Sequence, residues 1–350
     1  MKLALVFNVK PEAPADENES PLTSESVPDD KSSIDEYAEW DTWETINAVR
    51  DALAEYHQVH MIEANTEAFE KLKMLQPDLV FNIAEGMHGI SREAQIPAIL
   101  DMLRIPYTGS DPLTLSICLD KARTKEILKY HSIPTADFQV ISSLDELDAS
   151  KFSFPLFVKP NGEGSSKGIF NASLVHNAEE LTKAAAKIIN EYHQPALVEQ
   201  YLSGREFTVA LMGNGDNVEV LPIVEINFQE LPSHLAPVYS FEAKWIFDTK
   251  ENPLDIFSCP AHLDDDLKNR IETICKKAYK VLRCRDWSRI DVRLDAEGTP
   301  NIIEINPLPG ILPNPEDNSC FPKAARSAGM NYSALINRVA WLGAERYGIA

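Results

Sequence analysis

The sequence predicts an α/β protein made of two or three lobes. With 350 residues, the chain is longer than an ordinary domain of roughly 100 to 200 residues. Apolar runs of strand length alternate with helical patterns in its first part, which indicates a parallel sheet. Farther along, strands rich in Val, Phe and Ile follow one another and indicate a second, mixed lobe. A cleft between lobes is therefore expected.

Hydrophobic periodicity defines the elements of the first lobe. Strands are expected at residues 2–9, 59–62 and 79–83, and a helix at residues 67–75. Another helix is expected to begin near Asp41, which can cap it, because Glu44 follows three residues later and apolar residues then recur at helical spacing.

An acidic segment at residues 11–36 interrupts this pattern. It contains nine acidic residues, four prolines and one lysine. With so few apolar side chains, burial cannot offset the entropy lost on ordering the segment. A mobile acidic loop is expected, and a lid over a substrate is the more specific alternative.

The later elements are a helix from Asp111 into Leu128, a helix from Asp264 to about Val281, and a series of strands. These strands are expected at residues 157–159, 196–199, 207–212, 218–226, 288–294 and 301–305. Residues 295–298 read Asp-x-x-Gly between the last two strands, which is typical of a hairpin turn.

Composition excludes several classes of protein. A formal net charge of −21 argues against a nucleic-acid surface, which needs clustered Lys and Arg. No apolar run approaches the ~18 residues of a membrane helix, and the first apolar run is too short for a signal peptide. Five cysteines without a C-x-x-C pair indicate reduced thiols rather than disulfides or a zinc site. A soluble, cytoplasmic protein is expected.

The segment 157–169 combines a strand with a loop rich in Gly and Ser. Backbone N–H groups of such a loop can surround a polyphosphate, and Lys159 at its base supplies a positive charge. As a bare pattern this signal is weak. The alternative is a solvated hairpin loop with a surface lysine.

A second candidate site lies on the hairpin at residues 288–306. Alternate residues of a strand share a face, so Arg289 and Asp291 point the same way, as do Glu304 and Asn306. If the two strands pair, two carboxylates and an amide oxygen converge, and such hard ligands suit Mg2+ together with nucleotide phosphates. The alternative is that both carboxylates are ordinary outward-facing charges.

A third candidate is the strand-turn-strand segment 197–207. Glu199 ends one strand and Glu206 follows the Gly turn, so both could accept hydrogen bonds from an adenine amine and from ribose hydroxyls. Taken alone, each is more often a surface residue.

Eight short motifs then occur in one order along residues 79–340. They are I-P-Y-T-G-S (105–110), L-D-K-A-R-T-K (119–125), V-K-P-N-G-E-G-S-S-K-G (158–168), V-E-Q-Y-L-S-G-R-E-F-T-V (198–209), Y-S-F-E-A-K (239–244), R-I-D-V (289–292), E-I-N-P-L-P-G (304–310) and P-K-A-A-R-S-A-G (322–329). In these motifs the chain resembles the D-alanine–D-alanine ligase family of ATP-grasp enzymes.

That resemblance implies a three-lobe ATP-grasp fold with an N-terminal α/β lobe at 1–117, a central lobe at 118–212 and a C-terminal lobe with the metal site at 213–350. It also implies an ATP-dependent ligase that forms an amide bond through an acyl phosphate, with ATP and Mg2+ as cofactors. Two Mg2+ ions are expected, and Mn2+ could replace them. A homodimer is a further expectation, whereas nucleic acids and membranes are not expected as partners.

The resemblance also assigns residues to roles. The nucleotide would be held by Lys121, Lys159, Ser165, Ser166, Glu199, Glu206 and Lys244. The metal would be held by Asp291, Glu304 and Asn306. Catalysis would involve Arg289, Lys244, Ser165 and the backbone N–H of Gly310.

The chain departs from the family where amino-acid substrates would bind. Asn8, Val9 and Lys10 replace the Gly-rich turn whose Glu binds the substrate amine. Substitute carboxylates are Glu39, Asp41 and Glu85.

Three further departures lie in the same region. His88 is about one position out of step with the family's His, Trp245 replaces a Tyr, and Ser319 still matches after a longer link. D-alanine is the first candidate substrate, and another amino acid or small peptide is the close alternative. A catalytically silent ATP-binding module is the alternative of another class.

Overall fold

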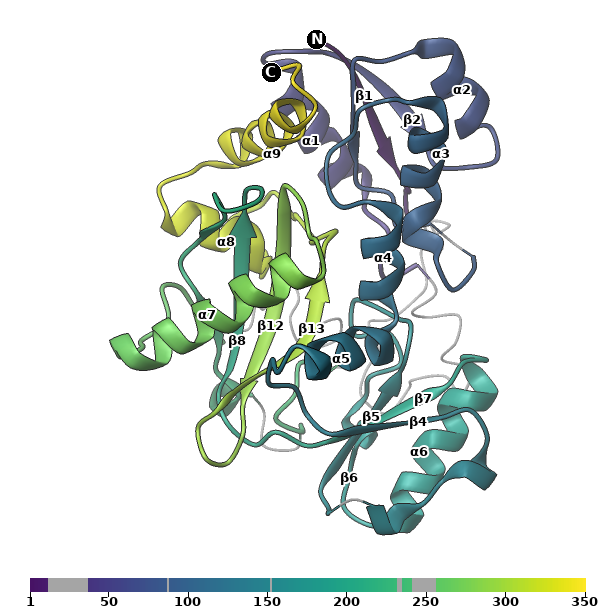
Figure 1. Ribbon diagram of the computed structural model, residues 1–350, viewed down its shortest axis with the longest axis vertical. Coiled ribbons are helices and arrows are strands. Elements are labelled where there is room, and N and C mark those ends of the chain that lie inside the picture. The colour runs from purple at the N-terminus through teal and green to yellow at the C-terminus, as the bar shows by residue number, and fades with distance from the viewer. Residues whose placement is uncertain (12–36, 87, 152, 232–234, 241–255) are drawn as a thin grey trace, which may run out of the picture.

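The fold comes from a computed structural model that describes residues 1–11, 37–86, 88–151, 153–231, 235–240 and 256–350. Within these residues the strands form three sheets, each covered by helices (Figure 1). Most of the predicted acidic loop and the segment 241–255 lie outside the described residues. No helix in the described part of the chain is long and apolar enough to cross a membrane.

The first sheet is parallel, as the alternating pattern predicted. Its strands are β1 (Lys2–Phe7), β2 (Gln58–Glu63) and β3 (Leu79–Asn82), in the order β2-β1-β3. The surrounding helices are α1 (Trp43–Ala54), α2 (Ala68–Leu75), the short 3-10 helix η2 (Arg92–Ala94) and α3 (Gln95–Leu103). β1 is central and is buried along almost its whole length, because both faces of the sheet are covered.

Asp41 does not cap α1, contrary to the sequence prediction. The N-cap position is Thr42, and no side chain caps this helix. Asp41 instead forms an isolated parallel bridge with Val9, and its carbonyl accepts a hydrogen bond from the Lys10 N–H at 2.8 Å. Asp41 is also one of the residues that line the cavity described below.

The single helix expected from Asp111 into Leu128 is two helices, α4 (Pro112–Leu119) and α5 (Lys121–Tyr130). Asp120 breaks the run because its backbone is extended at ψ 97°, and its carboxylate accepts the N–H of Arg123 as a cap. The break places Lys121 at the very start of α5.

The second sheet is antiparallel and lies at the lower end of the view in Figure 1. It contains β4 (Phe138–Ile141), β5 (Leu156–Pro160), β6 (Leu174–Val175) and β7 (Ala196–Gln200), in the order β4-β7-β5-β6. The helix α6 (Ala178–Glu191) packs Leu181, Ala185 and Ile188 against its apolar face.

The third sheet has the order β11-β10-β8-β12-β13, with β9 paired to β8. Its strands are β8 (Glu206–Met212), β9 (Glu219–Val220), β10 (Val224–Ile226), β11 (Phe257–Ser258), β12 (Trp287–Leu294) and β13 (Pro300–Asn306). The one strand expected at 218–226 is two short strands. Because β8 pairs with β12, we would move the second lobe boundary to before Glu206, although the boundaries themselves stay a prediction.

Helices α7 (Asp265–Val281) and α8 (Cys320–Ser327) pack against the third sheet. The last helix, α9 (Tyr332–Arg346), packs against α1, α8 and β3. Short 3-10 helices complete the described elements at Leu144–Glu146, Ala149–Lys151, Asn171–Ser173 and Phe228–Glu230. All five cysteines are free thiols, as expected.

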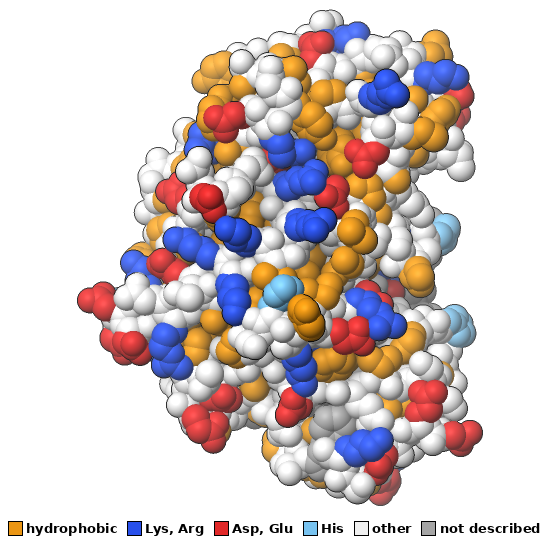
Figure 2. Space-filling model, viewed as in Figure 1, with side chains coloured by type: hydrophobic (Ala, Val, Ile, Leu, Met, Phe, Trp, Pro, Cys, Tyr) orange, Lys and Arg blue, Asp and Glu red, His pale blue; other side chains and the backbone are white. Residues whose placement is uncertain are grey.

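The net charge is unevenly spread over the surface. On the face shown in Figure 2, Lys and Arg side chains gather in the region of α7 and toward α9, and Asp and Glu side chains lie between them and along the margins. An acidic protein thus still presents local positive charge.

Candidate active site

A cavity of about 480 Å³ opens between the three sheets. Its walls come from the segment before α1, from β5 and the loop after it, from β7 and β8, from β12 and β13, and from residues 307–320. Of the predicted site residues that the structure describes, all but His88 line this cavity. His88 is exposed, and its carbonyl accepts a hydrogen bond from the side chain of Gln95 at 2.8 Å.

The carboxylates of the hairpin converge as strand alternation predicted. Asp291 on β12 pairs with Glu304 on β13, and Arg289 pairs with Asn306. Arg289 donates hydrogen bonds to both oxygens of Asp291, from Nε at 3.1 Å and from Nη2 at 2.9 Å. Thr208 Oγ1 donates to the same carboxylate at 2.9 Å. These side chains face the cavity rather than open solvent.

A β-bulge interrupts the hairpin next to these side chains. The register shifts between Asp291 and Val292, so that Val292 pairs with Ile302 and Ile303 has no cross-strand partner. An extra residue on one strand re-aims the side chains beside it. Val292 and Ile302 pack in the core, while Glu304 stays at the cavity.

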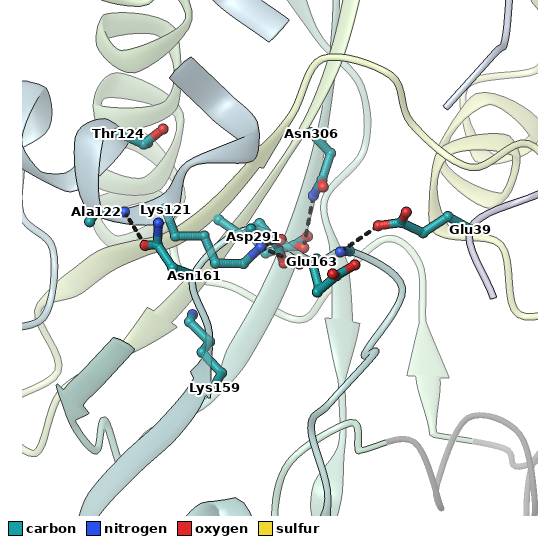
Figure 3. Close-up of polar contacts among 12 residues, drawn as sticks. Glu39, Lys121, Ala122, Thr124, Lys159, Asn161, Glu163, Asp291 and Asn306 are labelled. Atoms are coloured by element: carbon teal, nitrogen blue, oxygen red, sulfur yellow. Dashed lines mark hydrogen bonds and ion pairs between the residues drawn. The ribbon is translucent and has the colours of Figure 1, made fainter. Parts of the chain in front are cut away.

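Oxygen donors of this kind suit a hard divalent cation. Two carboxylates and the Asn306 amide form the candidate set, and the amide donates to Asp291 at 3.4 Å (Figure 3). No group of three His, Cys, Asp or Glu side chains arranged for a metal occurs in the described ranges. Mg2+ usually binds through one or two protein carboxylates together with phosphate oxygens, and the chemistry of the Asp291, Glu304 and Asn306 side chains fits that pattern.

Lys121 reaches the metal candidate from the start of α5. Its Nζ forms an ion pair with Glu304 at 2.9 Å and donates a hydrogen bond to the Glu163 carbonyl. Burial would raise the pKa of Glu304, but Lys121 and Lys159 outweigh that effect and lower it. Glu304 is thus held as a carboxylate.

Glu199 lies between two lysines, only one of which the sequence indicated. Lys159 contacts it at 2.7 Å and Lys125 at 2.6 Å, with all three side chains buried. Burial alone would raise the pKa of Glu199, yet the two lysines lower it to about 2. Lys125 belongs to the motif at 119–125 and follows Lys121 by four residues, which is about one helical turn. This spacing places both lysines on the same side of the helix and could have indicated that Lys125 also lies near the site.

Arg293 is a second residue that sequence reasoning missed. It donates to Glu206 at 2.9 Å, to the hydroxyl of Tyr201 at 2.8 Å and to the carbonyl of Pro237 at 2.7 Å. Burial raises the pKa of Glu206, and Arg293 opposes that shift. The same strand alternation that linked Arg289 to Asp291 would have placed Arg293 on this face.

The loop 161–168 forms one wall of the cavity. Ser165 and Ser166 both have left-handed backbones, with φ of 49° and 61°, and the hydroxyl of Ser166 donates to the Tyr239 carbonyl at 2.9 Å. Lys244, which the resemblance assigns to the nucleotide, and Trp245, which replaces a Tyr, fall outside the described residues. Ser319 donates to the Gly310 carbonyl at 3.2 Å and orders the final segment of the wall.

The candidate amine-binding carboxylates are in two different states. Arg92 donates to Glu39 at 2.7 Å, so Glu39 is already paired. Asp41 and Glu85 line the cavity, together with Glu93, which the sequence did not indicate. Burial and neighbouring carboxylates raise the pKa of Glu85. Burial is also the main cause that raises the pKa of Glu93 to about 8 and the pKa of Asp41 to about 7.

Comparison with known proteins identifies a family for this chain. Residues 127–340 match the family described as D-ala D-ala ligase C-terminus. The D-alanine–D-alanine ligase of Actinobacillus pleuropneumoniae is 34% identical over 302 residues, which are 85% of this chain and 91% of that protein. That of Glaesserella parasuis is 36% identical over 293 residues, 82% of this chain and 88% of that one.

Two further similarities extend over most of the chain. An uncharacterised protein of Sinorhizobium fredii is 38% identical over 269 residues, 77% of this chain and 75% of its own length. The crystal structure of D-alanine–D-alanine ligase from Bacillus anthracis complexed with ATP superposes with a TM-score of 0.71 at 24% identity. It covers 99% of this chain and 98% of that one.

Proposed function

The chain belongs to the D-alanine–D-alanine ligase family of ATP-dependent, ADP-forming ligases, and we propose that it joins two small substrates, each an amino acid or a short peptide, through an acyl phosphate. The observation that carries this proposal is the cavity where Lys121, Lys159, Arg289, Asp291 and Glu304 come together from separate elements. Its polar side chains suit a nucleotide at one end, and its acidic residues suit an amine at the other.

Nucleotide binding in so acidic a protein needs local positive charge. ATP adds about four negative charges to a chain of net charge −21, so cations must surround its phosphates. We assign Lys121 and Lys159 to the α and β phosphates and Lys244 to the γ phosphate. The pairing of Lys121 with Glu304 and of Lys159 with Glu199 supports this, because both ammonium groups are already held at the cavity wall.

Glu199 and Glu206 are assigned to the adenine and the ribose. Glu199 stays ionised next to two lysines, so it can accept a hydrogen bond only with the oxygen lone pairs that they leave free. Glu206 keeps one oxygen on Arg293 and lies on β8 at the same cavity. If Glu199 binds the adenine, it must accept a hydrogen bond from the nucleotide while it stays paired with Lys159.

The family uses a divalent metal, and we infer that Asp291, Glu304 and Asn306 hold Mg2+ here. When bound, such an ion would neutralise charge that develops on the phosphate oxygens. Arg289, which already donates to Asp291, would then be oriented toward the reacting phosphoryl group. The backbone N–H of Gly310 would donate to the developing oxyanion. Two ions, or Mn2+ in place of Mg2+, stay predictions.

For the substrate amine we propose the carboxyl groups of Asp41 and Glu85. Burial raises the pKa of both groups, and a bound ammonium would oppose that shift and favour the ionised form. Both line the cavity, and an ammonium group left unpaired in a closed site is costly. Glu39 is less suited than the sequence suggested, because Arg92 already engages both of its oxygens. D-alanine remains the first candidate substrate, but a pocket built on different carboxylates favours another amino acid or a small peptide.

A catalytically silent ATP-binding module is the alternative. A module that only bound nucleotide would not need Arg289, Asp291, Glu304 and Asn306 on one cavity face, and their cross-strand pairing therefore favours an enzyme. Release of phosphate from ATP that depends on an added amino acid tests the choice. Nucleotide binding without any such release, over a panel of D- and L-amino acids and dipeptides, would favour the silent module. A homodimer and a cytoplasmic location stay predictions.

A further inference from the structure

Two side chains of the first lobe contact the loop 161–168, although they are distant from it in sequence. Arg92, in η2, donates to the Gly162 carbonyl from Nη1 at 2.9 Å and to Glu163 Oε2 from Nη2 at 3.2 Å. It also donates to both oxygens of Glu39 at 2.7 Å. We call Glu39 and Arg92 the loop clamp.

Glu39 completes the clamp by accepting the backbone N–H of Gly164 at 2.6 Å. The approach is so close that a Cβ atom on Gly164 would lie 2.8 Å from Glu39 Oε1. Only glycine leaves room for that carboxylate, because Arg92 holds it in place. The segment that carries Glu39 is itself fixed, since the indole of Trp40 donates to the Gly86 carbonyl at 2.9 Å.

The clamp is buried and its polar groups are matched. The Arg92 and Glu39 side chains are 8% and 10% exposed, and that of Glu163 is 11% exposed. A buried ion pair stabilises a structure only when its geometry and its remaining hydrogen bonds are good. Here the guanidinium engages two carboxylates and one carbonyl, which is the planar fork that arginine provides and lysine does not.

The clamped loop is also connected to the candidate metal ligands. Lys121 donates to the Glu163 carbonyl and pairs with Glu304, so contacts run from the first lobe through the loop to β13. On the other side of the loop, Ser166 donates to Tyr239. The loop is therefore held by the first lobe on one side and by the other lobes on the other.

From this geometry we propose that Glu39 and Arg92 are positioning residues that hold the loop 161–168 over the phosphates of bound ATP. The clamp couples closure of the loop to the first lobe, whose Asp41 and Glu85 face the same cavity. It rests on the proposed function only in taking ATP to bind against this loop. Glu39 thus acts on the loop backbone rather than on a substrate amine.

Loop closure keeps water from the acyl phosphate, so a broken clamp has a specific consequence. ATP would still be hydrolysed, but less of it would yield amide. In Glu39→Gln and Arg92→Lys we expect the amide formed per ATP consumed to fall about tenfold or more, as expected when hydrogen bonds to charged groups are lost. The KM for ATP should rise less than kcat for amide formation falls.

Matched controls come from the same lobe. Arg50 and Glu55 lie in and just after α1, where Arg50 pairs with the neighbouring Asp51 and Glu55 is exposed. Arg50→Lys and Glu55→Gln repeat the two substitutions away from the loop and should keep the wild-type ratio of amide to ADP. Equal losses in these controls would show that the ratio reports general destabilisation instead of the clamp.

Hydrogen exchange tests the clamp without any turnover. Backbone amides of residues 161–168 should exchange at least about tenfold faster in Glu39→Gln than in the wild type, while those of β1 and β3 are unchanged. Because hydrogen exchange needs no reaction, it can contradict the clamp proposal while the ligase assignment stands. It can equally support the clamp when no ligase activity is found. Should Arg92→Lys fail to fold, Glu39→Gln and Gly164→Ala still decide.

Gly164→Ala provides a second line of evidence. The added methyl group would displace the Glu39 carboxylate, so Gly164→Ala should be tolerated better in combination with Glu39→Ala. We expect Gly164→Ala and Glu39→Ala together to lower the amide formed per ATP consumed by less than the sum of their separate effects. Unchanged loop exchange and an unchanged ratio in folded Glu39→Gln and Arg92→Lys would overturn the proposal.

Discussion

Asp291 on β12 and Glu304 on β13 are direct cross-strand neighbours at the rim of the central cavity. Each is matched by a cation of the chain, Asp291 by Arg289 and Glu304 by Lys121, at 2.9 Å in both cases. Two adjacent carboxylates would repel each other without these partners. The two carboxylates can bind a metal ion, and the neighbouring Arg289 and Lys121 can contact a polyphosphate.

The first prediction concerns Glu304. Glu304→Gln should keep the fold but lower kcat at least ~100-fold, because a metal-binding carboxylate contributes several kcal/mol to stabilising charge in the transition state. Steady-state phosphate release at varied Mg2+ measures the effect. Glu297→Gln, at the exposed turn of the same hairpin, is the control. Near wild-type turnover with an unchanged Mg2+ dependence would remove Glu304 from the site.

A second prediction separates nucleotide binding from substrate binding. Lys121→Met and Lys159→Met should weaken binding of a non-hydrolysable ATP analogue at least ~10-fold while amino-acid binding changes little, since each lysine is assigned to phosphates. Glu199 keeps Lys125 as a partner in Lys159→Met, so the fold should tolerate this change.

Isothermal titration calorimetry measures both affinities in the second prediction. Lys183→Met on α6 is the control, because this lysine is 74% exposed and lies away from the cavity. The phosphate assignment is wrong if both variants bind the analogue as tightly as the wild type does.

The third prediction follows from Asp41, whose pKa burial raises from 3.8 to about 7 while Lys10 opposes the shift. Glu85 and Tyr332 also interact electrostatically with it. The folded protein then holds a proton that the unfolded chain has lost, so this group lowers the stability as pH rises from about 4 to about 7.

Asp41→Asn should remove that contribution. Relative to the wild type, the variant should gain free energy of unfolding at pH 8 compared with pH 5, as measured by urea denaturation at the two pH values. If wild type and variant show the same change between these pH values, the Asp41 carboxyl does not carry the buried proton.

A fourth prediction addresses substrate choice. D-alanine should be a poorer acceptor than some other amino acid or dipeptide, because in our proposal the amine meets Asp41 and Glu85 in place of the Glu that the resemblance led us to expect. Glu85→Gln should raise the KM of the preferred amine at least ~10-fold with little change in the KM for ATP. If D-alanine alone supports turnover of order 1 to 10^3 per second and no other acceptor does better, the substrate pocket is that of the family.

Strand alternation made part of the site predictable from sequence. It placed Arg289, Asp291, Glu304 and Asn306 on one face, and the same rule would have found Arg293. The approach of Arg92 to Glu39 was not predictable, because it joins segments 53 residues apart through tertiary packing. Without that contact, the sequence left Glu39 as a candidate for binding the substrate.

Local signals explain two errors in the predicted elements. The aspartate at 120 had the character of a helix cap, but the helical periodicity around it suggested one continuous helix. Asp41 also resembled a cap, whereas the structure uses its backbone to bridge to Val9. In both places the choice depends on how the chain packs rather than on the spacing of apolar residues.

The measurement that tests the central claim most directly is a mass-spectrometric assay of the products formed from ATP, Mg2+ and pairs of amino acids or dipeptides. A ligase of this family should yield one amide, one ADP and one phosphate for each ATP consumed, and Asp291→Asn should abolish all three products together. The account would be contradicted if ATP were consumed and no pair of substrates gave an amide. Amide formation by folded Asp291→Asn would contradict it as well.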